Sequence, residues 1–170
     1  DSTPTGVPMI DEEIKAEILE LEEVEAVASY RYGYTNDGIS YKGNSLEGAS
    51  IIGADEDYFS VTGYIITKGR LFEESDFEDA RKCVIIDTTA AQSLFGSDDP
   101  ISKSLEINGD VYVVVGVVDK TDAFEPVIED IDDWYTYYYD DAAGKIFVPH
   151  TTWPMVYYFD EPYNVVIKAK

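Results

Sequence analysis

The spacing of apolar and polar residues divides the chain into short strands and short helices. Near the start, Asp11 precedes apolar residues at helical spacing that end at Leu21, which predicts a helix with Asp11 as its N-cap. Residues 24–34 then alternate toward a strand, and residues 39–53 continue as short strand candidates. The first third of the chain is therefore expected to be one helix followed by strands.

The middle of the chain changes between short elements and polar connections. The pattern predicts, in order, a turn or short helical segment at 55–59, a short apolar run at 64–67, an acidic loop at 72–77 and a buried strand at 82–86. A short helix follows at 88–95, because its alanines, Leu94 and Phe95 fall on one side. Gly96 stands at the position that commonly ends a helix.

Residues 105–118 predict a β-hairpin. Asn108 and Gly109 lie between two apolar runs, 105–107 and 111–112, and this pair favours the left-handed conformations of a type I′ turn. The second run continues through Val118 almost without a polar residue. We therefore expect its strand to be central in the sheet and covered on both faces.

The last third begins with a segment of different character. Asp, Glu and Tyr dominate residues 119–144, which predicts a long surface excursion. The chain then returns with a strand that Pro149 ends, a helix-like segment at 153–159 and a last strand at 165–168. Together these elements predict an α+β fold of mixed strands with a few short helices.

Composition limits the classes of partner. The 170 residues suit one domain, and 35 Asp and Glu against 12 Lys and Arg give a formal net charge of −23. Because phosphate backbones and anionic membranes are bound through clustered Lys and Arg, neither nucleic acid nor an anionic membrane surface is an expected partner. The longest unbroken aliphatic and aromatic run, residues 111–115, is too short to span a bilayer, and no signal peptide is visible, so the chain as it stands is expected to be soluble.

The residue types that carry chemistry are sparse. The one cysteine, Cys83, lies in an apolar strand pattern and is interpreted as a buried, inert thiol. The one histidine, His150, is interpreted as a strand-end residue at the surface, and no nucleophile elbow or glycine-rich phosphate loop is present. The acidic run has several Asp residues but not the spacing of a calcium loop, which favours a solvated anionic loop: Asp130, Asp132, Asp133, Asp140 and Asp141. No catalytic residue, metal or cofactor is expected.

Aromatic residues concentrate in the last quarter of the chain. Because tyrosine and tryptophan are favoured at interfaces, five residues of the acidic segment are the candidate contact site for a partner or ligand: Trp134, Tyr135, Tyr137, Tyr138 and Tyr139. The alternative is that the aromatic residues of this quarter pack in the core and rim of the last strands. The sequence leaves both interpretations open.

The order of the signals resembles the extracytoplasmic core domain of MacB-like ABC transporter permeases (MacB/FtsX-type). The resemblance spans roughly residues 10–168 and rests on a series of turn and strand motifs: Gly53, Tyr58 and Phe59, Gly69 and Arg70, Asp76, residues 84–87, residues 94–96, residues 99–101, Lys103, Asn108 and Gly109, and residues 115–117. Ser102 departs from the pattern, because the family usually has glycine there. In a chain so poor in cations, we expect Arg70 to be held by a carboxylate.

The resemblance implies a non-catalytic domain inserted after the first of four transmembrane helices of a permease. The full protein would be tethered in the cell membrane with this domain on the extracytoplasmic side. Its partners would be an ATP-binding subunit or domain of the same transporter, acting through the membrane part, and an adaptor or exported substrate. The domain would couple ATP-driven membrane movements to export or to partner contact outside the cell.

We interpret residues 1–170 as one MacB-like domain with two closely packed lobes. The terminal lobe would take about residues 9–62 and 145–170, and the central lobe about 63–144. A rival function is a free-standing secreted ligand-binding module that uses the Tyr- and Trp-rich C-terminal quarter. A third is a carboxylate-based hydrolase, which would need two carboxylates facing each other across a cleft.

Overall fold

A computed structural model describes residues 10–35, 38–121, 131, 143–157 and 162–170. Most of this part of the chain forms short elements, as the alternation of apolar and polar residues predicts. In chain order they are α1 (Glu12–Leu19), β1 (Val24–Tyr34), β2 (Ile39–Tyr41), β3 (Asn44–Leu46), β4 (Ser50–Ala54), α2 (Tyr58–Thr62), β5 (Tyr64–Gly69), α3 (Glu74–Glu78), β6 (Cys83–Asp87), α4 (Thr88–Phe95), β7 (Ser104–Ile107), β8 (Asp110–Lys120), β9 (Lys145–Pro149), η3 (His150–Thr152), α6 (Trp153–Tyr157) and β10 (Asn164–Ala169).

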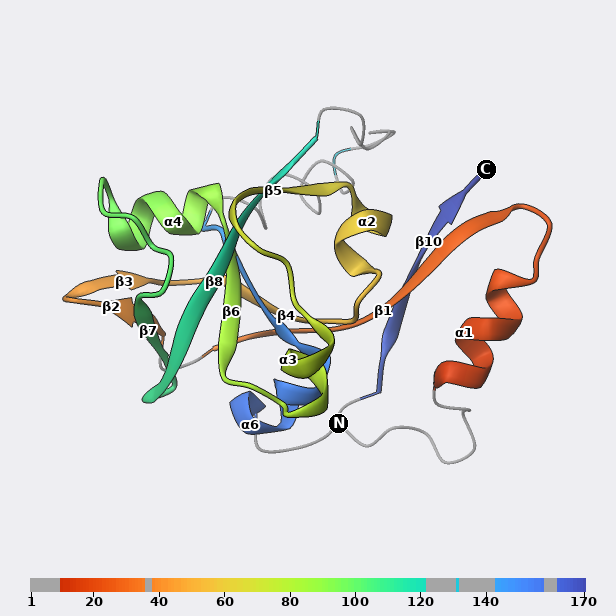
Figure 1. Ribbon diagram of the computed structural model, residues 1–170, viewed down its shortest axis with the longest axis horizontal. Helices are drawn as coiled ribbons and strands as arrows, with labels where there is room; N and C mark the ends of the chain where they lie inside the picture. Colours follow the sequence, from red (N-terminus) through yellow and green to blue (C-terminus); the bar gives the residue numbers. More distant parts are fainter. Residues whose placement is uncertain (1–9, 36–37, 122–130, 132–142, 158–161) are drawn as a thin grey trace.

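The strands form one mixed ten-stranded sheet (Figure 1). Its order is β10-β1-β4-β9-β6-β8-β7-β2-β3, and β5 pairs with β8 beside this path. The pairs β4–β9 and β6–β8 are parallel, whereas the other pairs are antiparallel. The α+β class with mixed strands and short helices is therefore confirmed. The sheet runs from strands of the expected terminal lobe into those of the central lobe, and the boundaries of the two lobes stay a prediction.

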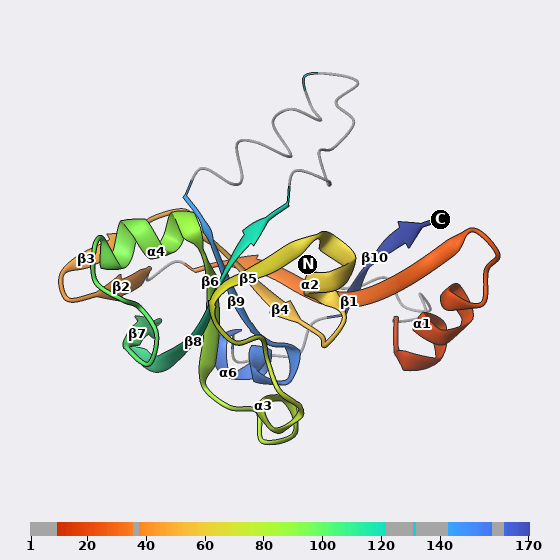
Figure 2. The ribbon, with the colours of Figure 1, turned by 45° about the horizontal axis from the view of Figure 1, so that its top comes forward.

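Apolar side chains fill both faces of the sheet. On one face, Leu94 of α4 and Trp153 of α6 belong to a core cluster with Ile86 of β6. On the other face, Phe59 of α2 packs with Phe147 of β9, at 5.0 Å between ring centroids. Figure 2 shows α4, α2 and α6 arranged around the central strands. Strands covered in this way on both faces explain the continuous apolar runs of β6 and β9.

Local signals in the sequence predict several elements correctly. Asp11 caps α1, because its side chain accepts a hydrogen bond from the backbone N–H of Ile14 at 3.0 Å. Helix α4 has the expected bounds and ends at Gly96. In the β7–β8 hairpin, Asn108 and Gly109 have φ angles of 52° and 82°, as a type I′ turn requires.

The acidic loop expected at 72–77 is wrong, because this segment contains the helix α3. A capping box begins the helix: Glu73 stands at the N-cap and Asp76 three residues later. Asp76 is fully buried and pairs with Arg70. The charge density of the segment suggests a loop, whereas the capping box and the ion pair between Arg70 and Asp76 stabilise a helix.

Strand β8 also differs from the expectation of cover on both faces. Val111 and Val113 are 52% and 40% exposed, whereas Tyr112 and Val114 between and after them are buried. The first half of β8 thus has one solvent face, and only its later residues, such as Val118, are enclosed. Of the turn or short helical segment expected at 55–59, only the last two residues are helical, because α2 spans Tyr58–Thr62.

Candidate functional site

The five aromatic residues expected to contact a partner lie outside the described residues. Trp134, Tyr135, Tyr137, Tyr138 and Tyr139 therefore remain a prediction, as does the interpretation of the neighbouring aspartates as a solvated loop. Within the described ranges, the structure brings together no group of three or more His, Cys, Asp and Glu side chains that could hold a metal ion.

Other aromatic residues of the last quarter belong to the core. Phe147 and Trp153 have no exposed surface. The Trp153 ring lies against Gly53 of β4, where a Cβ atom would come within 2.9 Å of it, and its centroid is 4.3 Å from that of Tyr157. For these residues the packing interpretation is correct, because glycine leaves room for flat rings on the sheet.

His150 is half-buried, so the expectation of a surface histidine is wrong. Its Nδ1 lies 2.7 Å from the hydroxyl of Tyr163, and its carbonyl accepts a hydrogen bond from Arg31 at 3.1 Å. Burial lowers the pKa of the imidazole, since charging it there costs solvation. Arg31 also lies over the Tyr163 ring, 4.0 Å from its centroid. This histidine joins β9 and η3 to β1 and to the start of β10.

Cys83 is a buried thiol, as the sequence predicts. It is 5% exposed. Burial, together with the nearby Asp76 carboxylate, raises the pKa of the thiol to about 12, which keeps it protonated at neutral pH.

Arg70 is held by a carboxylate, as expected. Its guanidinium contacts both oxygens of Asp76, with Nη1 2.7 Å from Oδ2 and Nη2 3.3 Å from Oδ1. The backbone N–H of Glu73 also donates to Asp76, at 2.9 Å. Burial alone raises the pKa of the Asp76 carboxyl, but these hydrogen bonds outweigh it and hold that pKa below its usual value. The pair fixes α3 to the end of β5.

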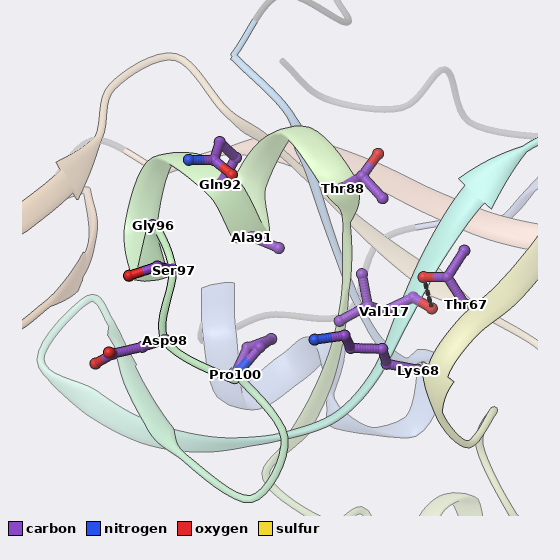
Figure 3. Close-up of a pocket in the computed structure, with 10 residues that line it drawn as sticks. All are labelled: Thr67, Lys68, Thr88, Ala91, Gln92, Gly96, Ser97, Asp98, Pro100 and Val117. Carbon is purple, nitrogen blue, oxygen red and sulfur yellow. Dashed lines mark hydrogen bonds between the residues drawn. The ribbon is translucent and has the colours of Figure 1, made fainter.

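A pocket of about 300 Å³ lies between α4, the end of β5 and the loop that follows α4 (Figure 3). Ala91, Pro100 and Val117 supply apolar lining. The amino group of Lys68 points into the pocket, whereas the carboxylate of Asp98 points away from it. Sequence reasoning missed this pocket, because its lining comes from segments up to fifty residues apart. The available local signal was Gly96, which ends α4 at the rim.

None of the helices in the described ranges is long and apolar enough to cross a membrane.

Residues 2–170 match the family model of the MacB-like periplasmic core domain. The uncharacterized ABC transporter permease YvrN of Bacillus subtilis (strain 168) is 28% identical over 169 residues, which cover 99% of this chain and 38% of that protein. The macrolide export ATP-binding/permease protein MacB of Aggregatibacter actinomycetemcomitans is 33% identical over 85 residues, 49% of this chain and 13% of that protein. The chain thus spans well under half the length of these relatives.

Two solved structures share the fold at 18% sequence identity. The extracellular domain of the noncanonic ABC-type transporter YknZ from Gram-positive bacteria matches with a TM-score of 0.69, over 95% of this chain and 74% of that one. The periplasmic region of MacB from Actinobacillus actinomycetemcomitans matches with a TM-score of 0.67, over 91% of this chain and 62% of that one. The family match across nearly the whole sequence and the shared sheet architecture lead to one conclusion: the chain belongs to the family of MacB-like periplasmic core domains.

Proposed function

We propose that this chain is a non-catalytic extracytoplasmic domain of a bacterial ABC transporter permease. It would couple ATP-driven movements in the membrane to substrate export or partner contact outside the cell. The observation that carries the proposal is the family match over residues 2–170, joined by a match of 99% of this chain to 38% of an ABC transporter permease. The partner that supplies energy would be an ATP-binding subunit or domain, since MacB relatives are named ATP-binding/permease proteins.

The packing of the chain supports a mechanical role. A single sheet with apolar cores on both faces has few ways to deform, because packed interiors resist changes in volume. The Arg70–Asp76 pair and the buried Cys83 stabilise this frame and offer no reactive group to a substrate. A force too small to break its strand pairs would therefore displace such a body as a whole.

The rival function, a ligand-binding module that uses aromatic residues, has no support from the described pocket. Its lining includes Lys68, Gln92 and Val117 but no aromatic residue. The carboxylate-based hydrolase needs a cleft with facing carboxylates, and Asp98, the acidic residue of this pocket, points away from it.

The extracytoplasmic location can be tested by labelling intact cells. In the full permease that contains this chain, Ser97→Cys places a thiol on an exposed turn. We expect a membrane-impermeant maleimide added outside the cells to label it, in a permease whose cysteines outside this chain have been replaced, and the same permease without Ser97→Cys to stay unlabelled because Cys83 is buried. Labelling of Ser97→Cys only after the cells are lysed would contradict the location.

The coupling role can be tested by replacing the domain. A full permease in which residues 10–170 are exchanged for a Gly- and Ser-rich linker should keep ATP hydrolysis by the assembled transporter but lose export. Export would be read from the growth of cells challenged with a panel of antibiotics and peptides that the intact transporter removes. Unchanged export, or substrate turnover by the isolated chain that one carboxylate substitution abolishes, would overturn the proposal.

A further inference from the structure

The pocket beside α4 contains an ammonium group without a close partner. The amino group of Lys68 points into the pocket (Figure 3). In the described part of the chain this group makes no hydrogen bond, and its ion pair with Asp99 spans 3.9 Å between Nζ and Oδ1. The side chains of Lys68 and Asp99 are 56% and 67% exposed, and such surface pairs contribute little. Because an ammonium has three donors, Lys68 is available to a ligand.

The two aspartates of the loop after α4 compete weakly for this cation. The Oδ1 atom of Asp99 accepts a hydrogen bond from the backbone N–H of Ile101 at 3.2 Å, which holds that carboxylate in the turn. The carboxylate of Asp98 points away from the pocket and interacts electrostatically with Lys42, which does not line it. The positive charge inside the pocket is therefore not cancelled at hydrogen-bond distance.

The apolar part of the lining suits a short aliphatic group. Ala91, Pro100 and Val117 supply this surface. The hydroxyl of Thr67 donates to the carbonyl of Val117 at 3.1 Å, which fixes the wall where β5 meets β8 (Figure 3). The volume of about 300 Å³ lies at the lower end of the range for ligand pockets. The pocket is thus sized for a small molecule.

One cation beside an apolar wall matches a ligand with one negative charge. A carboxylate accepts charge-assisted hydrogen bonds from an ammonium, and Thr88, Gln92 and Ser97 add hydroxyl or amide donors to the lining. The net charge of −23 opposes any anion at long range. In 150 mM salt this repulsion falls off over about 8 Å, so the charges nearest the pocket decide. Among the charged residues of the lining, Lys68 is the one that points inward.

We propose that this pocket is a binding site for a small monocarboxylate with a short, branched aliphatic chain. Lys68 would bind the carboxylate, and the apolar wall would contact the alkyl group. This inference goes beyond the proposed function, because such a ligand can bind whether or not the domain transmits movement. The two fail separately: ligand binding is measured on this chain alone and export on the full transporter.

A nuclear magnetic resonance titration of the isotope-labelled chain tests the proposal. The probe is isovalerate in 150 mM salt, which weakens unspecific attraction. We expect saturable shifts confined to the amides of residues that line the pocket, with a Kd on the order of 1 mM. Isovaleramide has the same shape without the charge, so it should bind at least about tenfold more weakly. Absence of saturable shifts in these residues, or equal binding of the two compounds, would overturn the proposal.

Variants of the chain test the two parts of the pocket separately. Lys68→Met keeps an apolar stem and removes the ammonium, so isovalerate should bind at least about tenfold more weakly. Ala91→Leu should weaken binding by a similar factor, because the larger side chain fills the space beside the apolar wall. The same spectra show whether each variant keeps the fold.

Lys168→Met is the matched control for the charge. Lys168 lies on β10, outside the pocket lining, with its side chain 35% exposed and paired with Glu25 at 2.6 Å. Its substitution removes the same charge from the chain, so binding of isovalerate should stay unchanged. Unchanged binding in Lys68→Met or Ala91→Leu, or an equal loss in Lys168→Met, would show that isovalerate does not bind in this pocket.

Discussion

Ser102 holds a backbone conformation that side chains disfavour. Its φ angle is 64°, and its N–H donates to the carbonyl of Val114 at 2.9 Å, so the conformation is fixed by pairing with β8. The family usually has glycine at this position, and glycine adopts such angles without a steric cost. The departure from the family pattern therefore leaves strain in the turn between Pro100 and β7.

Replacing this serine should stabilise the fold. We expect Ser102→Gly to raise the free energy of unfolding by about 0.5–1 kcal/mol, since relief of the left-handed strain exceeds the added chain entropy. Urea denaturation measures the change. Ser102→Ala, which keeps the Cβ atom, should give no such gain, and an equal gain in both variants would attribute the effect to the lost hydroxyl.

Asp76 should make the free energy of unfolding depend on pH. In the folded chain the pKa of its carboxyl lies below the ordinary 3.8. The ionised carboxylate therefore stabilises the fold fully above about pH 4, and this stabilisation is lost as the pH falls through the lowered pKa of the folded state. Asp76→Asn should cost about 2–3 kcal/mol at pH 7, because it leaves Arg70 with an uncharged partner. The difference from the unchanged chain should shrink below about pH 4.

Denaturant titrations at pH 7 and pH 3 measure this pH dependence. Asp79→Asn is the control, because Asp79 is exposed and pairs with Arg81 at the surface, 3.2 Å away. Such a pair contributes less than about 1 kcal/mol. A loss in Asp76→Asn that is the same at both pH values would show that its charge does not matter.

At the level of elements, the crossing of β5 and β8 depends on close backbone approach. A Cβ atom on Gly116 would lie 2.2 Å from the carbonyl oxygen of Arg70, which is a backbone atom that cannot turn aside. The Gly69 and Arg70 motif of the family meets β8 at this contact, since Gly69 pairs with Gly116. The motif has a structural reason: it lets the two strands come together where the Arg70–Asp76 pair begins.

Gly116→Ala should therefore destabilise the chain strongly. We expect a loss of at least about 3 kcal/mol, measured by thermal or urea unfolding, because the two strands must separate to admit the methyl group. Gly109→Ala is the control: no atom lies within 4 Å of its Cβ position, so only its left-handed φ opposes the change, at about 1 kcal/mol. Equal losses would show that the crossing tolerates the methyl group.

The elements also show which information the sequence contains locally. Helix α4 and the β7–β8 hairpin were predictable because Gly96, Asn108 and Gly109 act within a few residues of their own position. Helix α3 also has a local signal, the capping box of Glu73 and Asp76, but the density of acidic residues in this segment favoured a loop. Only the complete burial of Asp76 depends on the folded structure around it.

Among the candidate site residues, the sequence likewise predicted some contacts and missed others. The pairing of Arg70 with a carboxylate followed from the scarcity of cations, and burial of Cys83 followed from its apolar neighbours. The half-buried His150 depends on Tyr163, thirteen residues later, and the pocket depends on four separate segments. Contacts that form only when distant segments meet have no periodic pattern along the chain.

At the level of the whole molecule, the aromatic acidic segment remains the predicted site of contact with a partner or ligand. We expect alanine substitutions of Trp134, Tyr135, Tyr137, Tyr138 and Tyr139 to change the melting temperature by less than about 2 °C, but to impair transport by the full permease or binding of its partner. Surface residues contribute little to stability, whereas interface aromatics contribute much to binding.

Trp153→Ala is the control for those substitutions. Trp153 is fully buried against β4, so its truncation should cost about 3–5 kcal/mol and lower the melting temperature by roughly 8 °C or more. Calorimetry of the chain measures both effects. A loss of similar size in the 134–139 variants would mean that those rings are core residues and not a contact site.

The antiparallel pairing of β10 with β1 decides how the domain responds to a pull. Ala169 lies opposite Val24, and Lys170 donates its backbone N–H to the carbonyl of Glu23, so the end of β10 adjoins the beginning of β1. A force that drew residues 10 and 170 apart would unravel α1, which has no buried residue, and then peel β10 away one rung at a time. The pairing between β10 and β1 would thus break at low force, before the inner strands of the sheet bear load.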